Sequence, residues 1–113
     1  MSKEPVEYLK HIRDEGLYIM SVLSKGLTKE DFLNDETLKR AIVRSLEIIG
    51  EATKKIPADY KIQWNNVKWK EMAGMRDRLI HDYMGVNYSI VWDVIKNKIP
   101  ELCDQIVIVI DKE

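Results

Sequence analysis

Residues 36–55 read ETLKRAIVRSLEIIGEATKK, and their apolar side chains recur every three or four positions. That spacing is typical of a helix that buries one face. The apolar stripe consists of Leu38, Ala41, Ile42, Ser45, Leu46, Ile49 and Ala52. Asp35 or Glu36 begins this helix, and Pro57 ends it because the residue before a proline is kept out of the helical region. The stretch therefore predicts a long helix packed against a core.

The same periodicity continues upstream. A first helix is predicted over about residues 4–25, with Pro5 in its first turn and Gly26 as its stop. The sequence from Thr28 to Asp31 resembles a capping box and opens a short turn.

Downstream, residues 57–64 are expected to form a loop or a single irregular turn. A third helix is expected from Asn65 or Asn66, which are good N-caps, fraying over residues 81–84. Asn87 is expected to cap a last helix.

Four or five helices with short loops predict an all-α fold, an antiparallel helix bundle. The last helix is expected to be kinked or broken near Ile99 by Pro100. The β-branched run at 106–110 has strand propensity, but the sequence offers no second strand to pair with it. With 113 residues and no linker or repeat, residues 1–113 are expected to form one domain.

Composition argues against several classes of protein. No run of about 18 apolar residues exists, so no membrane span is predicted. The N-terminal residues lead into no apolar signal segment, so a cytoplasmic location is expected. The single cysteine, Cys103, excludes an internal disulfide and a cysteine-based metal cluster, and it falls on an apolar stripe typical of a core. No metal-binding or cofactor-binding motif is present, so neither a metal site nor a cofactor is predicted.

The net charge of −1 conceals an uneven distribution. Residues 37–80 carry a net charge of +5, between two segments of −3 each. The basic residues on the long helix could follow a nucleic-acid backbone, and an exposed charged face explains them as well; they are Lys39, Arg40, Arg44, Lys54 and Lys55. Trp64, Trp69 and Trp92 could stack on RNA bases, but core or interface packing is favoured.

Residues 75–83, MRDRLIHDY, concentrate side chains suited to phosphodiester chemistry. Histidine transfers protons near neutral pH, and arginine stabilises developing charge on a phosphate. Asp77 and His81 are four residues apart and share a helix face, where the carboxylate can fix the imidazole tautomer. Arg76 and His81 lie about 140° apart on an ideal helix, so they converge only if the helix unwinds or a second chain contributes. The alternative is a purely structural role, in which His81 interacts with the helix dipole at the C-terminal end of the helix and Arg78 pairs with Asp82.

These residues carry a resemblance to a known family. Arg76, His81 and Tyr83 match the Arg-x4-His-x-Tyr signature of HepT-like toxins, in the HEPN superfamily of ribonucleases. The segments that also look like the family are residues 44–52, which end in Gly-Glu-Ala, residues 64–76, and residues 91–102. The similarity extends from about Glu7 to Ile110.

The resemblance implies a HEPN-like helical homodimer in which two copies of the motif meet at a cleft. It implies metal-independent endoribonuclease activity, with Arg76 and His81 as the catalytic pair and no cofactor. Asp77 stands where family members often carry Asn. Glu51, Arg44 and Arg78 are candidates for cleft or RNA contacts, although a solvated position beside the lysines explains Glu51 equally well.

The resemblance also implies a partner. Tyr83 matches the tyrosine that an MntA-type minimal nucleotidyltransferase antitoxin modifies with AMP. The chain would then be the toxin of a type II or type VII-like toxin–antitoxin pair, and a larger hetero-oligomer with the antitoxin is conceivable. Two other functions stay open: a non-catalytic nucleotide- or substrate-binding subunit that docks on such a nucleotidyltransferase, and a dimeric helical module without chemistry.

Overall fold

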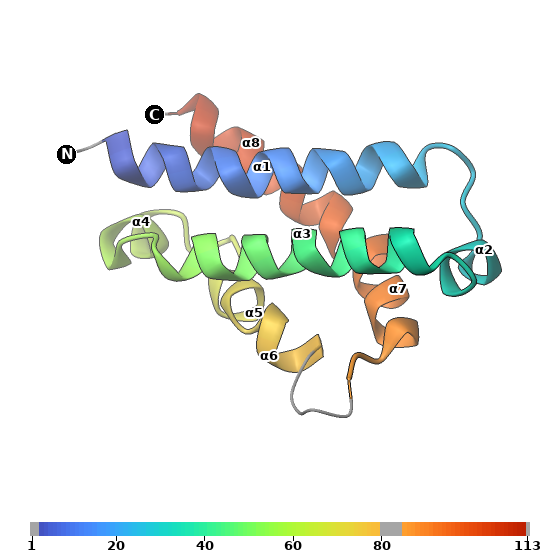
Figure 1. Ribbon diagram of the computed structural model, residues 1–113. Helices are drawn as coiled ribbons and strands as arrows, with labels where there is room; N and C mark the ends of the chain where they lie inside the picture. The colour runs from blue at the N-terminus through green and yellow to red at the C-terminus, as the bar shows by residue number, and fades with distance from the viewer. Residues whose placement is uncertain (1–2, 80–84, 113) are drawn as a thin grey trace.

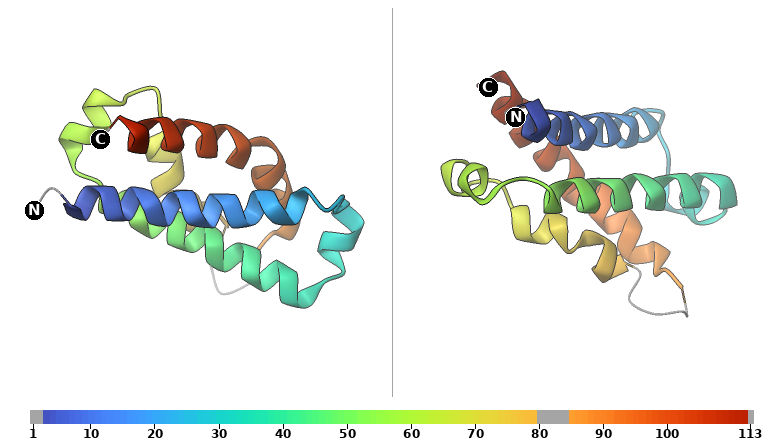
Figure 2. Two further views of the ribbon diagram at one scale, coloured as in Figure 1. Left: turned by 90° about the horizontal axis from the view of Figure 1, so that it is seen from above. Right: turned by 60° about the vertical axis from the view of Figure 1, so that its left-hand side comes forward.

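Two long helices lie side by side and run in opposite directions. The computed structural model describes residues 3–79 and 85–112, apart from the side chains of residues 3, 4, 76 and 78. Helix α1 (Lys3–Leu23) packs along α3 (Glu36–Lys54), and α8 (Ile99–Asp111) packs on α1 (Figures 1 and 2). The described residues form helices and turns without a strand, which confirms the all-α class. No helix among them is long and apolar enough to cross a membrane.

The connection between α1 and α3 follows the predicted turn chemistry. Gly26 lies in the turn that follows α1. Its φ of 80° is a conformation that favours glycine. The predicted capping box is present at the start of α2 (Lys29–Leu33): Thr28 Oγ1 accepts a hydrogen bond from the Asp31 N–H. Asp35 then caps α3 by accepting from the Leu38 N–H at 2.9 Å.

Helix α3 lies at the centre of the bundle. It contacts α1 on one side and, on the other, α5 (Trp69–Ala73) and α6 (Met75–Leu79). Its buried face is therefore wider than the predicted stripe and includes Val43, Gly50 and Thr53. The buried Thr53 hydroxyl donates to the Ile49 carbonyl at 2.7 Å, which satisfies it. Side chains such as Leu46 and Ile49 are fully buried, and the burial of each contributes about 1.5–3 kcal/mol to the free energy of folding.

Residues 57–69 differ from the prediction. They form a short helix, α4 (Ala58–Gln63), where a loop or irregular turn was expected. The next helix begins at Trp69 rather than near Asn65 or Asn66. The reason is tertiary: Val67 and Trp69 are buried, and the Trp69 indole N–H donates to the Trp64 carbonyl at 2.9 Å. The helix expected over this region is also divided at Gly74 into α5 and α6.

The last two helices confirm the predicted break. Asn87 caps α7 (Tyr88–Asn97) by accepting from the Ile90 N–H at 3.2 Å. Helix α8 then begins at Ile99, and Pro100 occupies its first turn, where a missing N–H costs nothing. The run at 106–110 is helical, as the absence of a strand partner predicted. Where α8 crosses α1, a Cβ at Gly16 would overlap the Cys103 Sγ, so glycine permits this close approach.

Candidate functional site

Helix α6 carries the first half of the predicted motif. Met75 and Leu79 are one turn apart and are buried, so they anchor α6 in the core. Asp77 lies between them with an exposed side chain. The backbone of Arg76 and Arg78 belongs to the same short helix. The core contacts of α6 therefore hold this part of the motif at a defined place beside α3.

The second half of the motif lies outside the described residues. His81 and Tyr83 belong to residues 80–84, as does Asp82, the expected partner of Arg78. How Arg76 and Asp77 are placed relative to His81 therefore stays a prediction. The described chain resumes at Gly85, whose φ is 107°, and Asn87 then starts α7.

Two further candidates lie on the solvent side of α3. Arg44 and Glu51 are two turns apart, with side chains 64% and 55% exposed, and they form an ion pair at 3.8 Å. Their helix packs against α6, so α3 and α6 bring Arg44, Glu51 and Asp77 onto neighbouring elements. A pair this exposed contributes about 0–1 kcal/mol. Arg44 can therefore exchange its carboxylate partner for a phosphate at little cost.

Other residues with candidate roles are part of the packing. Trp69 and Trp92 are buried, and the Trp92 ring lies 5.6 Å from that of Phe32, as core packing predicted. Trp64 is half-buried. Burial and the neighbouring Asp104 raise the pKa of the Cys103 thiol to about 11, so it stays protonated near neutral pH and is a poor nucleophile.

Lys39 does not belong to an exposed basic face. Its side chain is only 12% exposed, it pairs with Glu36 at 2.8 Å, and its Nζ lies 4.6 Å above the Tyr88 ring. The Lys39 side chain and its hydrogen bond lower the pKa of the Glu36 carboxyl. Lys39 thus ties α3 to α7, whereas Arg40, Arg44, Lys54 and Lys55 are exposed.

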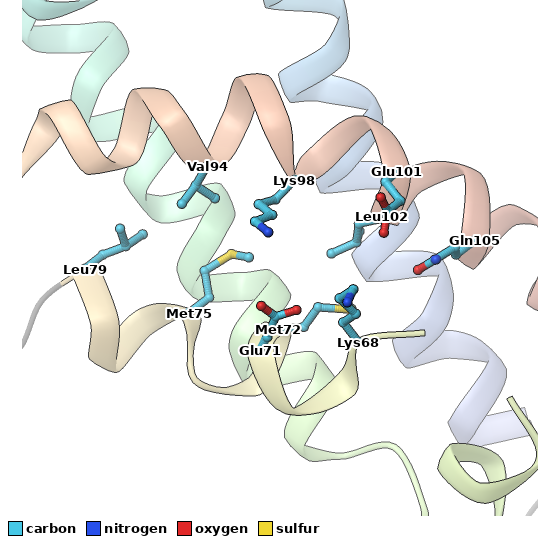
Figure 3. A pocket seen from close by; sticks show the side chains of 10 residues that line it. All are labelled: Lys68, Glu71, Met72, Met75, Leu79, Val94, Lys98, Glu101, Leu102 and Gln105. Carbon is cyan, nitrogen blue, oxygen red and sulfur yellow. The ribbon is translucent and has the colours of Figure 1, made fainter. Parts of the chain in front are cut away.

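A groove separates α5 and α6 from α7 and α8 (Figure 3). Its floor is apolar and consists of Met72, Met75, Leu79, Val94 and Leu102. The charged rim comes from both sides: Lys68 precedes α5 and Glu71 belongs to it, and Lys98 and Glu101 lie at the start of α8. The volume is about 40 Å³, which holds a few water molecules but no nucleobase. Sequence analysis did not identify this groove, although the same Lys-x-x-Glu spacing occurs at 68–71 and 98–101.

No metal centre is evident in the described part of the chain. Among residues 3–79 and 85–112, no group of three or more His, Cys, Asp and Glu side chains could hold a metal ion. His11, the histidine within these ranges, is exposed on α1.

Comparisons with known proteins identify the family of this chain. The family model described as "Ribonuclease HepT-like" matches residues 7–109. A protein of Caldanaerobacter subterraneus subsp. tengcongensis named "Putative RNase TTE0752" is 50% identical over 111 residues, 98% of each chain. A "Probable ribonuclease HepT" of Thermococcus cleftensis is 41% identical over 102 residues, 90% of this chain and 92% of the relative. No solved structure gives a significant match. The chain belongs to the HepT-like ribonuclease family.

Proposed function

We propose that this protein is a metal-independent endoribonuclease toxin that cleaves RNA with Arg76 and His81. Membership of a ribonuclease family supports RNA cleavage in general. The observation that carries the finer proposal is the intact Arg76-x4-His81-x-Tyr83 motif, whose first residues lie on a helix anchored between Met75 and Leu79.

The chemistry fits these residue types. RNA carries its own nucleophile, the 2′-OH, so the reaction needs no activated water. The 2′ oxygen bonds to phosphorus as the bond to the 5′ oxygen breaks, leaving a 2′,3′-cyclic phosphate and a 5′-OH. His81 takes the proton of the 2′-OH or supplies one to the leaving oxygen. Arg76 neutralises the charge that develops on the phosphorane.

A homodimer supplies what one chain lacks. Two copies of the motif at a shared cleft provide one histidine to accept a proton and another to donate one. A dimer also removes the need for Arg76 and His81 to converge on a single helix face. Asp77, one turn before His81, is proposed to hold the imidazole tautomer. Arg78 and Arg44 are proposed to contact RNA phosphates, with Glu51 beside them at the cleft.

Regulation is proposed to act on Tyr83. An MntA-type nucleotidyltransferase antitoxin would transfer AMP to its hydroxyl and thereby place a bulky anion near Arg76. That anion excludes the RNA phosphate by charge and volume. In this proposal the protein works in the cytoplasm as the toxin of a type II or type VII-like pair.

The charge of the chain favours a second candidate function, one without RNA binding. A net charge of −1 and an exposed Asp77 disfavour tight RNA binding. A non-catalytic subunit that docks on a minimal nucleotidyltransferase, and presents nucleotide or substrate to it, would have no need of an RNA-binding surface.

The test is cleavage of a labelled RNA pool in EDTA. Wild type is compared with His81→Ala and Arg76→Ala, and with His11→Ala and Arg13→Ala, which alter the same residue types on α1. We expect products ending in cyclic phosphate from wild type and from both α1 variants, and none from the motif variants. Equal cleavage by all five proteins would refute the site. If no protein cleaves, intact mass distinguishes a chain already carrying AMP from a docking subunit.

A further inference from the structure

The segment from Lys54 to Lys70 concentrates the protein's positive charge. It holds five lysines and one acidic residue, Asp59, for a net charge of +4. The rest of the chain therefore carries −5, since the whole chain carries −1. The five lysines are Lys54, Lys55, Lys61, Lys68 and Lys70. A local reversal of the overall sign is the electrostatic pattern of a surface that attracts a polyanion.

These lysines are available to a ligand. Four of the five are exposed, and Lys61 is half-buried. The ion pairs within the described residues join Arg13 to Asp14, Lys39 to Glu36 and Arg44 to Glu51, so none of the five lysines takes part. No carboxylate in the described part of the chain forms an ion pair with any of them. An incoming phosphate would not have to displace an internal partner.

The segment is held in place and leads toward the motif. It begins at the end of α3, passes through α4 at one end of the bundle, and enters α5, which packs on α3 and precedes α6 (Figure 1). Its backbone is fixed by the hydrogen bond from Trp69 to Trp64 and by a hydrogen bond at 3.4 Å from the Gln105 side chain to the Asn66 carbonyl. A strand bound along it would therefore run toward Arg76.

The segment also offers groups that contact bases. Ile62 is 75% exposed, more than the other exposed large apolar side chains in the described part of the chain, Leu17, Tyr18 and Ile108. Gln63, Asn65 and Asn66 are exposed and carry amide groups that pair with base edges. Apolar and amide groups among lysines fit a single-stranded RNA, whose bases are unpaired and accessible.

We propose that residues 54–70 form an RNA-binding surface that holds the substrate strand beyond the cleaved bond. This inference rests on the proposed ribonuclease function and assigns the substrate contacts outside the motif. Each lysine that neutralises a phosphate releases a bound cation, so affinity falls more steeply with salt. The slope of log affinity against log salt decreases by about 0.7 for each single-strand phosphate contact removed, or about 1.4 for two lysines.

The experiment compares three double variants with the same charge change. Lys54→Gln/Lys55→Gln and Lys68→Gln/Lys70→Gln alter the surface. The control, Lys25→Gln/Lys29→Gln, alters the turn after α1 and the first residue of α2, at the opposite end of the bundle (Figures 1 and 2). All carry His81→Ala to prevent cleavage. Fluorescence anisotropy measures binding of a labelled uridine oligomer of about 12 nucleotides. Salt is varied between about 50 and 200 mM.

We expect each surface pair to reduce the salt slope by about 1.4, so that its affinity falls about sevenfold less across this range than that of the parent protein. The control pair should leave the slope unchanged. With His81 restored, the surface variants should raise KM for RNA and leave kcat unchanged. Slopes equal to the control's for both surface pairs would overturn the proposal. Failure of the proposed function has a different signature, the absence of cleavage by wild type.

Discussion

The contact between α1 and α8 makes Gly16 a sensitive position. An alanine Cβ there would overlap the Cys103 Sγ, and both residues lie within helices, so neither backbone moves easily. Overpacking a core costs about 1–3 kcal/mol. Alanine in place of glycine inside a helix returns about 1 kcal/mol. We therefore expect Gly16→Ala to lower the free energy of unfolding by up to about 2 kcal/mol, although alanine is the better helix former.

The double variant isolates the cause. Cys103→Ala removes the Sγ and leaves a small cavity, which by itself costs about 1 kcal/mol. With both substitutions, the new methyl group at position 16 occupies the space that the sulfur vacates. We expect the double variant to be close to wild type in stability, so the two effects are not additive. Urea unfolding of wild type, both single variants and the double variant measures this coupling. A Gly16→Ala variant as stable as wild type, or two effects that simply add, would show that the packing of α1 on α8 does not depend on this contact.

Three other predictions follow from the described residues. Asn87→Ala removes the cap of α7 and should lower the free energy of unfolding by about 1 kcal/mol, measured by urea titration. Asn87→Asp keeps a capping side chain and should leave the free energy of unfolding near that of wild type. The pKa of Cys103 is higher in the folded protein, at about 11, than its ordinary value near 9, so stability should fall as pH rises between these values, by at most about 1.4 kcal/mol per pH unit. In urea titrations at alkaline pH, the Cys103→Ala variant should not show this fall in the free energy of unfolding with pH. Glu51→Gln frees Arg44 and should tighten RNA binding with little change in melting temperature, whereas Arg44→Ala should weaken binding; the opposite order would exclude Arg44 as an RNA contact.

Local rules accounted for much of the fold because the relevant interactions are short in sequence. The capping box at Thr28, the start of α3 after Asp35, the cap at Asn87 and the break before Pro100 each involve residues within four positions of one another. The stripe on α3 was visible for the same reason. These predictions are confirmed.

The misplaced elements depend on distant partners. The start of α5 is decided by the burial of Trp69 in the core, which overrides the capping preference of the asparagines before it. The hydrogen bond from its indole to Trp64, five residues away, accompanies that burial. Lys39 was grouped with exposed cations because its contact with Tyr88 joins residues far apart in the chain. The groove beneath α6 likewise needs α5 and α8 together before it exists.

By itself, the sequence determined the helical class, the caps and the motif of Arg76, His81 and Tyr83, because periodicity, turn chemistry and motif spacing are properties of nearby residues. Only the tertiary structure decided that α6 packs against α3, the helix that carries Arg44 and Glu51, that the Lys39 side chain is largely buried, and that α1 and α8 meet at Gly16. Burial and contact between separate helices are set by how the whole chain packs, and no single segment carries that information.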